Sequence, residues 1–180
     1  MNKTETLYTG TKGIEQLTGV QRTLFARRIS RALTRHPDTM GQRTPEEIIT
    51  SMEQGRSVVI ADGEQIRAYT DVSNQTDEEG KIIADEMICR TWVTFDRGNG
   101  YGATVMKHAA ALAREHGAKK VVTNINVAND DANNVIKKMG QTREIRFAGV
   151  KPSQYIKDAL VNVYDVTNLG QQETLLPAYI

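Results

Sequence analysis

The residues Arg97-Gly98-Asn99-Gly100-Tyr101-Gly102 form a glycine-rich string that could bind a phosphate group. A β-branched run precedes the string and a helical pattern follows it, so its backbone amides would lie at a helix N-terminus, where the helix dipole favours an anion. Gly100 and Gly102 have no Cβ, which lets the backbone approach a pyrophosphate and adopt positive φ angles. A tight strand-to-helix turn needs the same glycines, so the string alone leaves both interpretations open.

Two common phosphate-binding loops fit this string poorly. A P-loop requires Gly-Lys followed by Ser or Thr, whereas Gly102 is followed by Ala103. The dinucleotide-binding fingerprint is matched literally, but it also requires an acidic residue about 20 positions later to bind the ribose. The next expected strand offers Asn124 and Asn126 instead.

A third interpretation is an acyl-CoA loop, and two spaced motifs support it. Arg97, Gly100 and Gly102 fit the pattern Arg or Gln, two residues, Gly, one residue, and Gly or Ala. Residues 129–140 fit a second pattern, which begins Asn, two residues, Ala and ends in Gly. In these motifs the sequence resembles the GNAT superfamily of N-acetyltransferases, and the resemblance is best over residues 81–141.

The resemblance implies a fold and an activity. It implies an α/β (α+β) fold in which helices flank a mixed, mostly antiparallel sheet within a single domain. That N-acetyltransferase-like domain would span residues 1–180, with an acyl-CoA-binding core at 81–141 and a tail at 168–180. The implied activity is transfer of the acetyl group of acetyl-CoA to an unidentified amine by direct attack.

The resemblance also assigns residues to the binding of acetyl-CoA. Backbone groups of Thr91, Trp92 and Val93 would pair with the pantetheine arm, and one of their amides would polarise the thioester carbonyl. Asn129 could bond the amides of the arm, although an Asn there suits a helix N-cap equally well. The residues expected to bind acetyl-CoA are Thr91, Trp92, Val93, Arg97, Gly98, Asn99, Gly100, Tyr101, Gly102, Ala103 and Asn129.

Glu86 is the candidate general base. An ammonium has no lone pair, so acetyl transfer needs a base, or a water chain leading to one, that takes a proton from the amine. Glu86 lies eleven residues before Arg97, and the family members that are most similar in this stretch have a glutamate base there. The alternative is a solvent-facing strand carboxylate, with Asp85 on the opposite face. The tyrosine that often serves the family as general acid is replaced by Ile136.

Periodicity and turn residues predict the elements that would position this site. Strands are expected at residues 4–9, 57–61, 65–72, 81–94, 121–127, 144–147 and 161–166. Helices are expected at residues 20–35 and 45–54, from the glycine string to residue 117, and at 130–139. The polar residues 73–80 are expected to form a loop.

The first two helices have specific signals. Thr44 and Glu47 form a capping box, and Pro45 is suited to the first helical position of the second helix. The residues expected to face the core from the first helix are Val20, Leu24, Ile29, Ala32 and Leu33. The arginines on its opposite side are Arg22, Arg27, Arg28, Arg31 and Arg35.

Composition excludes several classes of protein. The chain has 180 residues, of which 39% are apolar and 25% charged, so one ordinary soluble domain is expected rather than a disordered, collagen-like or coiled-coil protein. Lys and Arg number 23 and Asp and Glu 22, a balance that makes nucleic acid an unexpected partner. Cys89 is the single cysteine, and no Cys and His grouping has zinc spacing, so no metal is expected and the cytoplasm is the expected compartment. No apolar run is long enough for a membrane span.

Two alternatives stay open beside the acetyltransferase. The loss of the usual tyrosine at Ile136 favours a non-catalytic module that binds or senses acyl-CoA. The arginine-rich first helix favours an RNA-associated acetyltransferase. A homodimer is possible on either interpretation.

Overall fold

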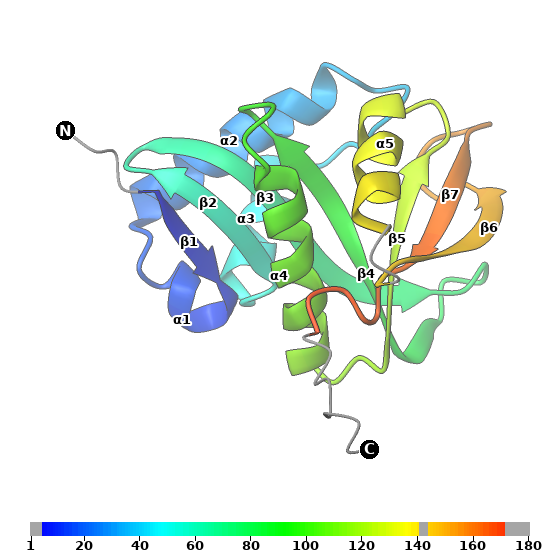
Figure 1. Cartoon of the computed structure of the whole chain (residues 1–180). Coiled ribbons are helices and arrows are strands. Elements are labelled where there is room, and N and C mark those ends of the chain that lie inside the picture. Colours follow the sequence, from blue (N-terminus) through cyan, green and yellow to red (C-terminus); the bar gives the residue numbers. More distant parts are fainter. Residues whose placement is uncertain (1–4, 141–143, 172–180) are drawn as a thin grey trace, which may run out of the picture.

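The structure is a computed structural model that describes residues 5–140 and 144–171. The described residues form a seven-stranded sheet with the strand order β1-β2-β3-β4-β5-β7-β6 (Figure 1). The strands are β1 (Thr6–Thr9), β2 (Ser57–Asp62), β3 (Gln65–Thr76), β4 (Ile82–Thr94), β5 (Lys120–Asn126), β6 (Arg146–Pro152) and β7 (Leu160–Asp165). The helices are α1 (Gly10–Ile14), α2 (Gly19–Thr34), α3 (Pro45–Glu53), α4 (Tyr101–Glu115) and α5 (Asp130–Met139).

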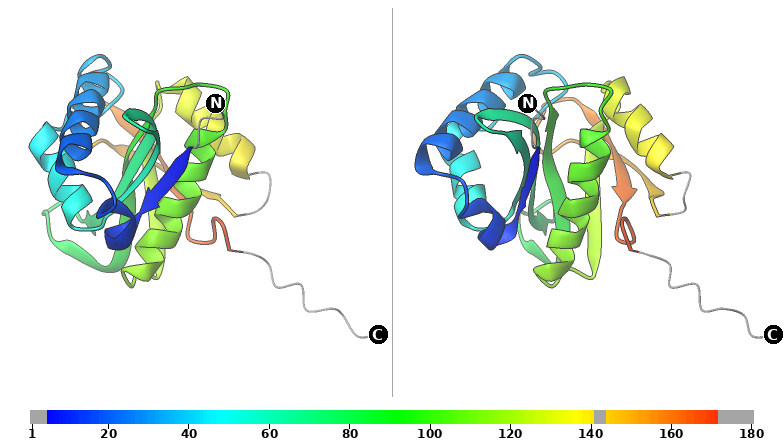
Figure 2. Two further views of the ribbon diagram at one scale, coloured as in Figure 1. Left: turned by 90° about the vertical axis from the view of Figure 1, so that its left-hand side faces the viewer. Right: turned by 60° about the vertical axis from the view of Figure 1, so that its left-hand side comes forward.

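Helices cover both faces of the sheet. Figure 2 shows α2 and α3 on one side and α4 and α5 on the other. Each face has its own apolar core, one centred on α4 and the other on α2 and α3. Among the described strands, β4 and β5 are the one parallel pair, and every other neighbouring pair is antiparallel. These findings confirm the expected fold class.

Capping residues fix where the helices of the first half begin. At α3, the capping box of Thr44 and Glu47 is present, with Pro45 in the first turn, as the sequence predicts. At α2, Thr18 and Gln21 form a second capping box that the sequence analysis missed. In such a box the side chains satisfy backbone donors that the first helical turn leaves unpaired.

The buried face of α2 differs from the expected stripe. Val20 is 76% exposed and Leu24 is 43% exposed, whereas Phe25, Ile29 and Leu33 are buried against the sheet. Successive helical residues are rotated by about 100°, so burying Phe25 turns Leu24 away from the core. The larger apolar surface of Phe25 therefore decides which face packs.

Two strands also extend beyond their predictions. The prediction of a loop at residues 73–80 is wrong in its first half. Ser73 and Asn74 continue β3 and pair with Ile88 and Met87 of β4. Tertiary pairing overrides the low strand propensity of such residues.

The other extension is β6, which runs past the expected 144–147 to include Gly149 and Pro152. A strand tolerates both residue types because β6 lies at the edge of the sheet.

Within the described part of the chain, no helix is long and apolar enough to cross a membrane. The same residues include no cluster of three or more His, Cys, Asp or Glu side chains that could hold a metal ion.

Candidate functional site

The parallel strands β4 and β5 separate halfway along their length. Their pairing runs from Glu86 opposite Lys120 to Cys89 opposite Thr123, and no pair follows, although both strands continue. Beyond this point β4 stays paired with β3, and β5 stays paired with β7. A gap therefore opens in the middle of the sheet, and its two edges carry backbone groups that are not paired with each other.

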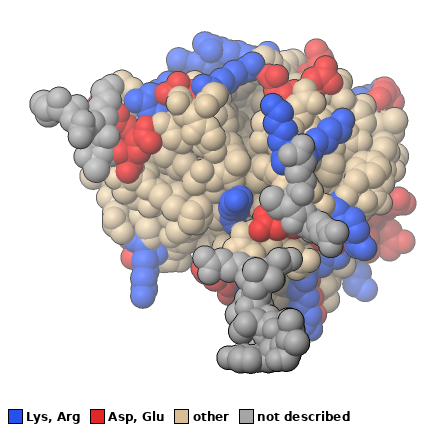
Figure 3. Space-filling view, viewed as in Figure 1, with Lys and Arg blue, Asp and Glu red and all other residues tan. Residues whose placement is uncertain are grey.

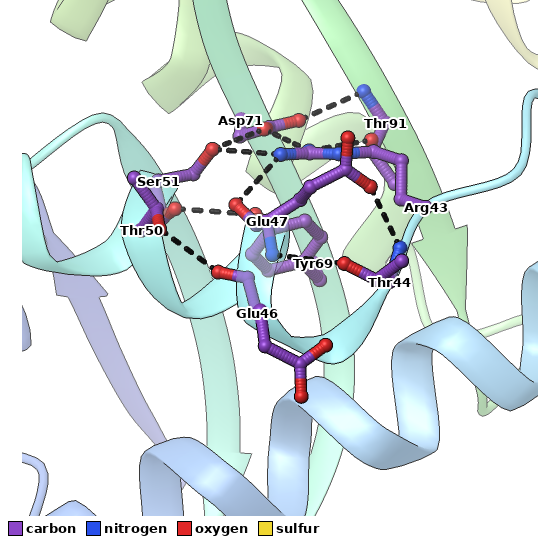
Figure 4. A network of polar contacts seen from close by, with 10 residues as sticks. Arg43, Thr44, Glu46, Glu47, Thr50, Ser51, Tyr69, Asp71 and Thr91 are labelled. Carbon is purple, nitrogen blue, oxygen red and sulfur yellow. Dashed lines mark hydrogen bonds and ion pairs between the residues drawn. The ribbon is translucent and has the colours of Figure 1, made fainter.

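A β-bulge lies where the gap begins. On β4, Arg90 and Thr91 together stand opposite the single residue Asp71 of β3. The Asp71 carboxylate accepts a hydrogen bond of 2.9 Å from the Thr91 backbone N–H (Figure 4). A bulge removes an amide from the regular ladder, and here a side chain supplies the missing acceptor.

A buried ion pair holds this carboxylate in place. Arg43 is 8% exposed and Asp71 is 1% exposed, and the Arg43 Nη1 is bound to the Asp71 carboxylate and lies 3.0 Å from the Thr91 hydroxyl. The Arg43 Nη2 donates to the Glu47 carbonyl and the Ser51 hydroxyl, each at 2.9 Å. Burial lowers the pKa of Arg43, but Asp71, Tyr69 and Glu47 together raise it by more, so the pKa of Arg43 lies above its ordinary value and its guanidinium is charged. The network joins α3, β3 and the bulge (Figure 4).

The bulge determines which amide faces the gap. The N–H of Thr91 is bound to Asp71, and the N–H of Phe95 donates to the Arg67 carbonyl of the strand β3 at 2.8 Å. Peptide groups alternate between the two edges of a strand, so the Trp92 N–H points toward the gap. Of Thr91, Trp92 and Val93, the three residues expected to contact the pantetheine arm, Trp92 thus presents its amide where the arm would lie.

The glycine string forms the turn that leads from β4 into α4. Gly98 and Gly100 have φ angles of +85° and +73°, which favour glycine over any other residue. Gly100 is the N-cap of α4, no side chain caps this helix, and its first turn contains no acidic residue. A Cβ at Gly100 would meet nothing within 4 Å. The amides of the first turn are therefore open to an anion.

Gly102 serves packing instead. A Cβ at this position would lie 3.2 Å from both the Thr94 hydroxyl and the Trp92 ring. The missing side chain lets α4 pack closely on the end of β4. The two glycines of the motif thus have different physical roles.

The other predicted residues of the string lie around this turn. Arg97 forms an exposed ion pair of 2.7 Å with Asp131 in the first turn of α5. The Tyr101 hydroxyl donates to the Glu5 carboxylate, and this bond raises the pKa of Tyr101. Asn99 is exposed, and Ala103 is half-buried in α4. Figure 3 shows the surface hollowed between α4 and α5 on this face.

A cavity lies beside the gap. Its walls include residues of β4 and β5, residues 39–43 before α3, and residues 153–156 between β6 and β7. Arg90 and Trp92 of β4 line it, and the Arg90 guanidinium lies 4.8 Å from the centre of the Tyr155 ring. The Asn126 amide donates to the Asp38 carbonyl at 3.1 Å, which ties β5 to the loop before α3.

Glu86 lies near this cavity but outside its lining. Its carboxylate is 2.7 Å from the Lys120 Nζ, where β4 and β5 begin to pair. Ile88, two residues further along the strand, does line the cavity. Asp85 pairs with Lys119 and has a φ of +59°, so simple strand alternation does not apply at this point.

Three further side chains complete the description. The Asn129 Oδ1 accepts the Ala132 N–H at 3.1 Å and caps α5, and the residue also lines the cavity. Ile136, where the family often has tyrosine, is fully buried in the core. Burial raises the pKa of the Cys89 thiol to about 12, so Cys89 is not a thiolate nucleophile at neutral pH.

Comparison with known proteins identifies the family. The family model described as "Acetyltransferase (GNAT) family" matches residues 27–141. The chain belongs to the GNAT family of acetyltransferases. No curated protein is similar enough in sequence to count as a match.

Solved GNAT structures share the fold at low sequence identity. A structure of yncA from Salmonella typhimurium, which contains acetyl-CoA, has a TM-score of 0.65 at 11% identity over 92% of this chain and 94% of that chain. An N-acetyltransferase from Staphylococcus aureus Mu50 has a TM-score of 0.64 at 12% identity over 90% and 97% of the two chains. A GCN5-related N-acetyltransferase from Kribbella flavida has a TM-score of 0.61 at 14% identity over 89% and 96%.

The residues present fit the acetyl-CoA that GNAT acetyltransferases use. The uncapped first turn of α4 offers amides to a pyrophosphate, and the open space at Gly100 leaves room for it. The Trp92 amide faces the gap where an extended arm could pair as an added strand. Sequence reasoning did not identify as candidate site residues Arg43, Arg90 and Asn124, which line the cavity, or Asp71, which binds Arg43. The one signal for them was a carboxylate, Asp71, inside an otherwise β-rich run.

Proposed function

We propose that this GNAT protein is an N-acetyltransferase that transfers the acetyl group of acetyl-CoA to an amine by direct attack. The observation that carries the proposal is the gap between β4 and β5 after Cys89 and Thr123, which opens beside the uncapped N-terminus of α4. An extended thioester could cross the sheet there, with its phosphates at α4 and its acyl end at the cavity.

The chain's own groups supply the parts of such a reaction. The amides of the first turn of α4 bind the pyrophosphate, and the backbone of Trp92 holds the arm in the gap. The Trp92 N–H also stabilises the negative charge that develops on the thioester oxygen when the amine attacks. The ion pair of Arg43 and Asp71 positions this amide by fixing the bulge beside it.

Glu86 is our proposed base, acting through water. Residues two apart on a strand are separated by roughly 7 Å, so Glu86 is one step beyond Ile88 of the cavity wall and too far for direct contact with an amine held there. A water molecule between the carboxylate and the amine would carry the proton. Tyr155, which lines the cavity, is the alternative group to test.

A binding experiment tests the proposed site. Trp92 is the single tryptophan, so its fluorescence reports on the gap without a label. We expect a saturable change on addition of CoA, with matching heat in calorimetry. Gly100→Asp should weaken binding strongly because a carboxylate would face the pyrophosphate.

The matched control is Gly63→Asp. Gly63 has a φ of +59°, and a Cβ there also meets nothing within 4 Å, but it lies in the turn between β2 and β3. Both variants place a non-glycine residue at a positive φ with open space around its Cβ, so a loss of CoA affinity in Gly100→Asp alone locates the site. Equal affinity in the two variants would contradict it.

A non-catalytic acyl-CoA-binding module is the second candidate. The burial of Ile136 in the core favours it, because no tyrosine stands where the family often has a general acid. Saturable binding of acetyl-CoA without transfer to any amine would support this candidate over the enzyme.

A further inference from the structure

The charged side chains around the cavity are all cations. Of the described residues that line it, Arg43 and Arg90 are charged, and none is Asp or Glu. The charge of Arg43 is compensated by Asp71. Arg90 forms no ion pair with any described residue, and its printed partner is the ring of Tyr155. The cavity therefore presents one uncompensated positive charge.

This charge lies where the reaction would take place. Arg90 belongs to the bulge at which β4 leaves β5, one residue after the last pair of the two strands. The Tyr155 ring, over which the guanidinium of Arg90 lies, fixes the plane of that group. Its N–H donors can then form two hydrogen bonds with one anion. A polycationic acceptor would be repelled at this position, and an acceptor with a negative group would be attracted.

A hydrogen-bond acceptor lies across the gap from this cation. Asn124 directly follows Thr123, the last residue of β5 to pair with β4, and it lines the cavity. Its Oδ1 is buried and has no partner among the described residues. Such an orphan oxygen is rare in folded proteins and would be satisfied by an N–H group of a ligand.

We propose that the acceptor is an amine with a carboxylate next to its amino group, of which an α-amino acid is the simplest example. Arg90 binds the carboxylate, and Asn124 binds an N–H of the amine. The proposal rests on the acetyltransferase function proposed above. In the reaction the amine nitrogen forms a bond to the acetyl carbon, the C–S bond breaks, the nitrogen loses a proton and the departing thiolate gains one.

The test compares three pools of amines under one assay. The full-length protein is incubated with acetyl-CoA and a pool of the amino acids, a pool of their α-amides, or a pool of diamines and polyamines, and products are identified by mass. We expect acetylated amino acids and little product from the other two pools. Aminophosphonates, in which a phosphonate replaces the carboxylate, show whether the anion must be a carboxylate.

The outcomes distinguish a failure of this inference from a failure of the proposed function. Preferred acetylation of the amides or polyamines overturns the inference and leaves the enzyme standing. Preference for the aminophosphonates overturns the assignment of a carboxylate as the group that Arg90 binds. Acetylation of no pool, with acetyl-CoA bound, overturns the proposed function and the inference together.

Variants of Arg90 supply the second readout. Arg90→Gln should lower kcat/KM for an amino acid that the wild type acetylates by roughly 10- to 100-fold. The loss should arise mainly through KM, because a charge-assisted hydrogen bond to the carboxylate is lost. Its activity toward the matching amide should be unchanged, and Arg90→Lys should recover part of the loss.

The control is Arg146→Gln, which removes an exposed arginine that pairs with Asp165 away from the cavity. CoA binding, followed by Trp92 fluorescence, should equal that of the wild type in all three variants. An equal loss for the amino acid and its amide in Arg90→Gln would contradict the assigned role.

Discussion

Substitution of Glu86, the proposed base, tests its role directly. Glu86→Gln keeps the shape of the side chain but cannot accept a proton. We expect turnover to fall by roughly 10²- to 10⁴-fold at neutral pH with CoA affinity unchanged, as loss of general-base catalysis predicts. The deficit should shrink as the pH rises, because a larger fraction of the amine is then neutral without help.

Asp85→Asn is the matched control for Glu86. Asp85 is the adjacent residue, and it also pairs with a lysine, Lys119, which directly precedes β5, at 2.8 Å. The turnover of Asp85→Asn should equal that of the wild type. Wild-type turnover in Glu86→Gln between pH 6 and 9 would remove Glu86 from the mechanism and direct attention to Tyr155.

At the same scale, the buried pair of Arg43 and Asp71 is expected to stabilise the fold as well as the site. Asp71→Asn leaves the Arg43 charge buried without its partner, so we expect a loss of about 3–5 kcal/mol in the free energy of unfolding. Denaturant titration measures it. Asp131→Asn, which breaks the exposed pair with Arg97, should cost less than about 1 kcal/mol. Similar effects of the two changes would contradict a stabilising role of the buried pair.

Among the elements, α2 offers a test of the RNA-associated alternative. Arg27, Arg28 and Arg31 are exposed on α2 and do not line the cavity, and Arg28 lies over the Phe95 ring. Changing all three to Gln should leave CoA affinity and kcat/KM for a small amine within about two-fold, as expected for surface substitutions.

Two other outcomes would give the arginines of α2 a functional role. A rise in KM for the acceptor alone would place these arginines at the entrance to the acceptor site. Tight, salt-dependent RNA binding that the triple change abolishes would support the RNA-associated alternative.

Local signals explain which elements the sequence could predict. The glycine turn, α3 and its capping box are specified by residues within a few positions of one another, and the structure has them where the pattern places them. The strand at 73–76 could not be predicted, because its polar residues are ordered by pairing with β4. The predicted buried stripe of α2 was right at Ile29 and Leu33 but wrong at Val20 and Leu24, because spacing alone did not weigh the size of Phe25.

The candidate site divides in the same way. The turn that would hold a pyrophosphate is contiguous in sequence, so its motif was visible. The bulge depends on Arg43, Asp71 and Thr91, which come from separate segments and meet only in the folded chain. Arg90 and Tyr155 likewise meet across 65 positions of sequence. Long-range contacts of this kind leave no pattern in a single sequence.

At the scale of the whole molecule, the candidate site has two parts. The turn into α4 lies on the face of the sheet that α4 and α5 cover (Figure 2), and the cavity is lined by the loop before α3, the loop between β6 and β7, and Asn129 and Ala132 at the start of α5. The gap between β4 and β5 joins them. Transfer through this gap would bring the acetyl group to the amine while the rest of each substrate stays apart.

The central claim is that the chain transfers acetyl groups through this gap, and one measurement tests it most directly. Wild-type protein and Gly100→Asp are each incubated with acetyl-CoA and pooled amines, and free CoA and acetylated amine are quantified together. We predict that the wild type forms the two products in equal amounts and that Gly100→Asp forms far less of both. Saturable binding of acetyl-CoA by the wild type with no acetylated amine from any pool would contradict the claim.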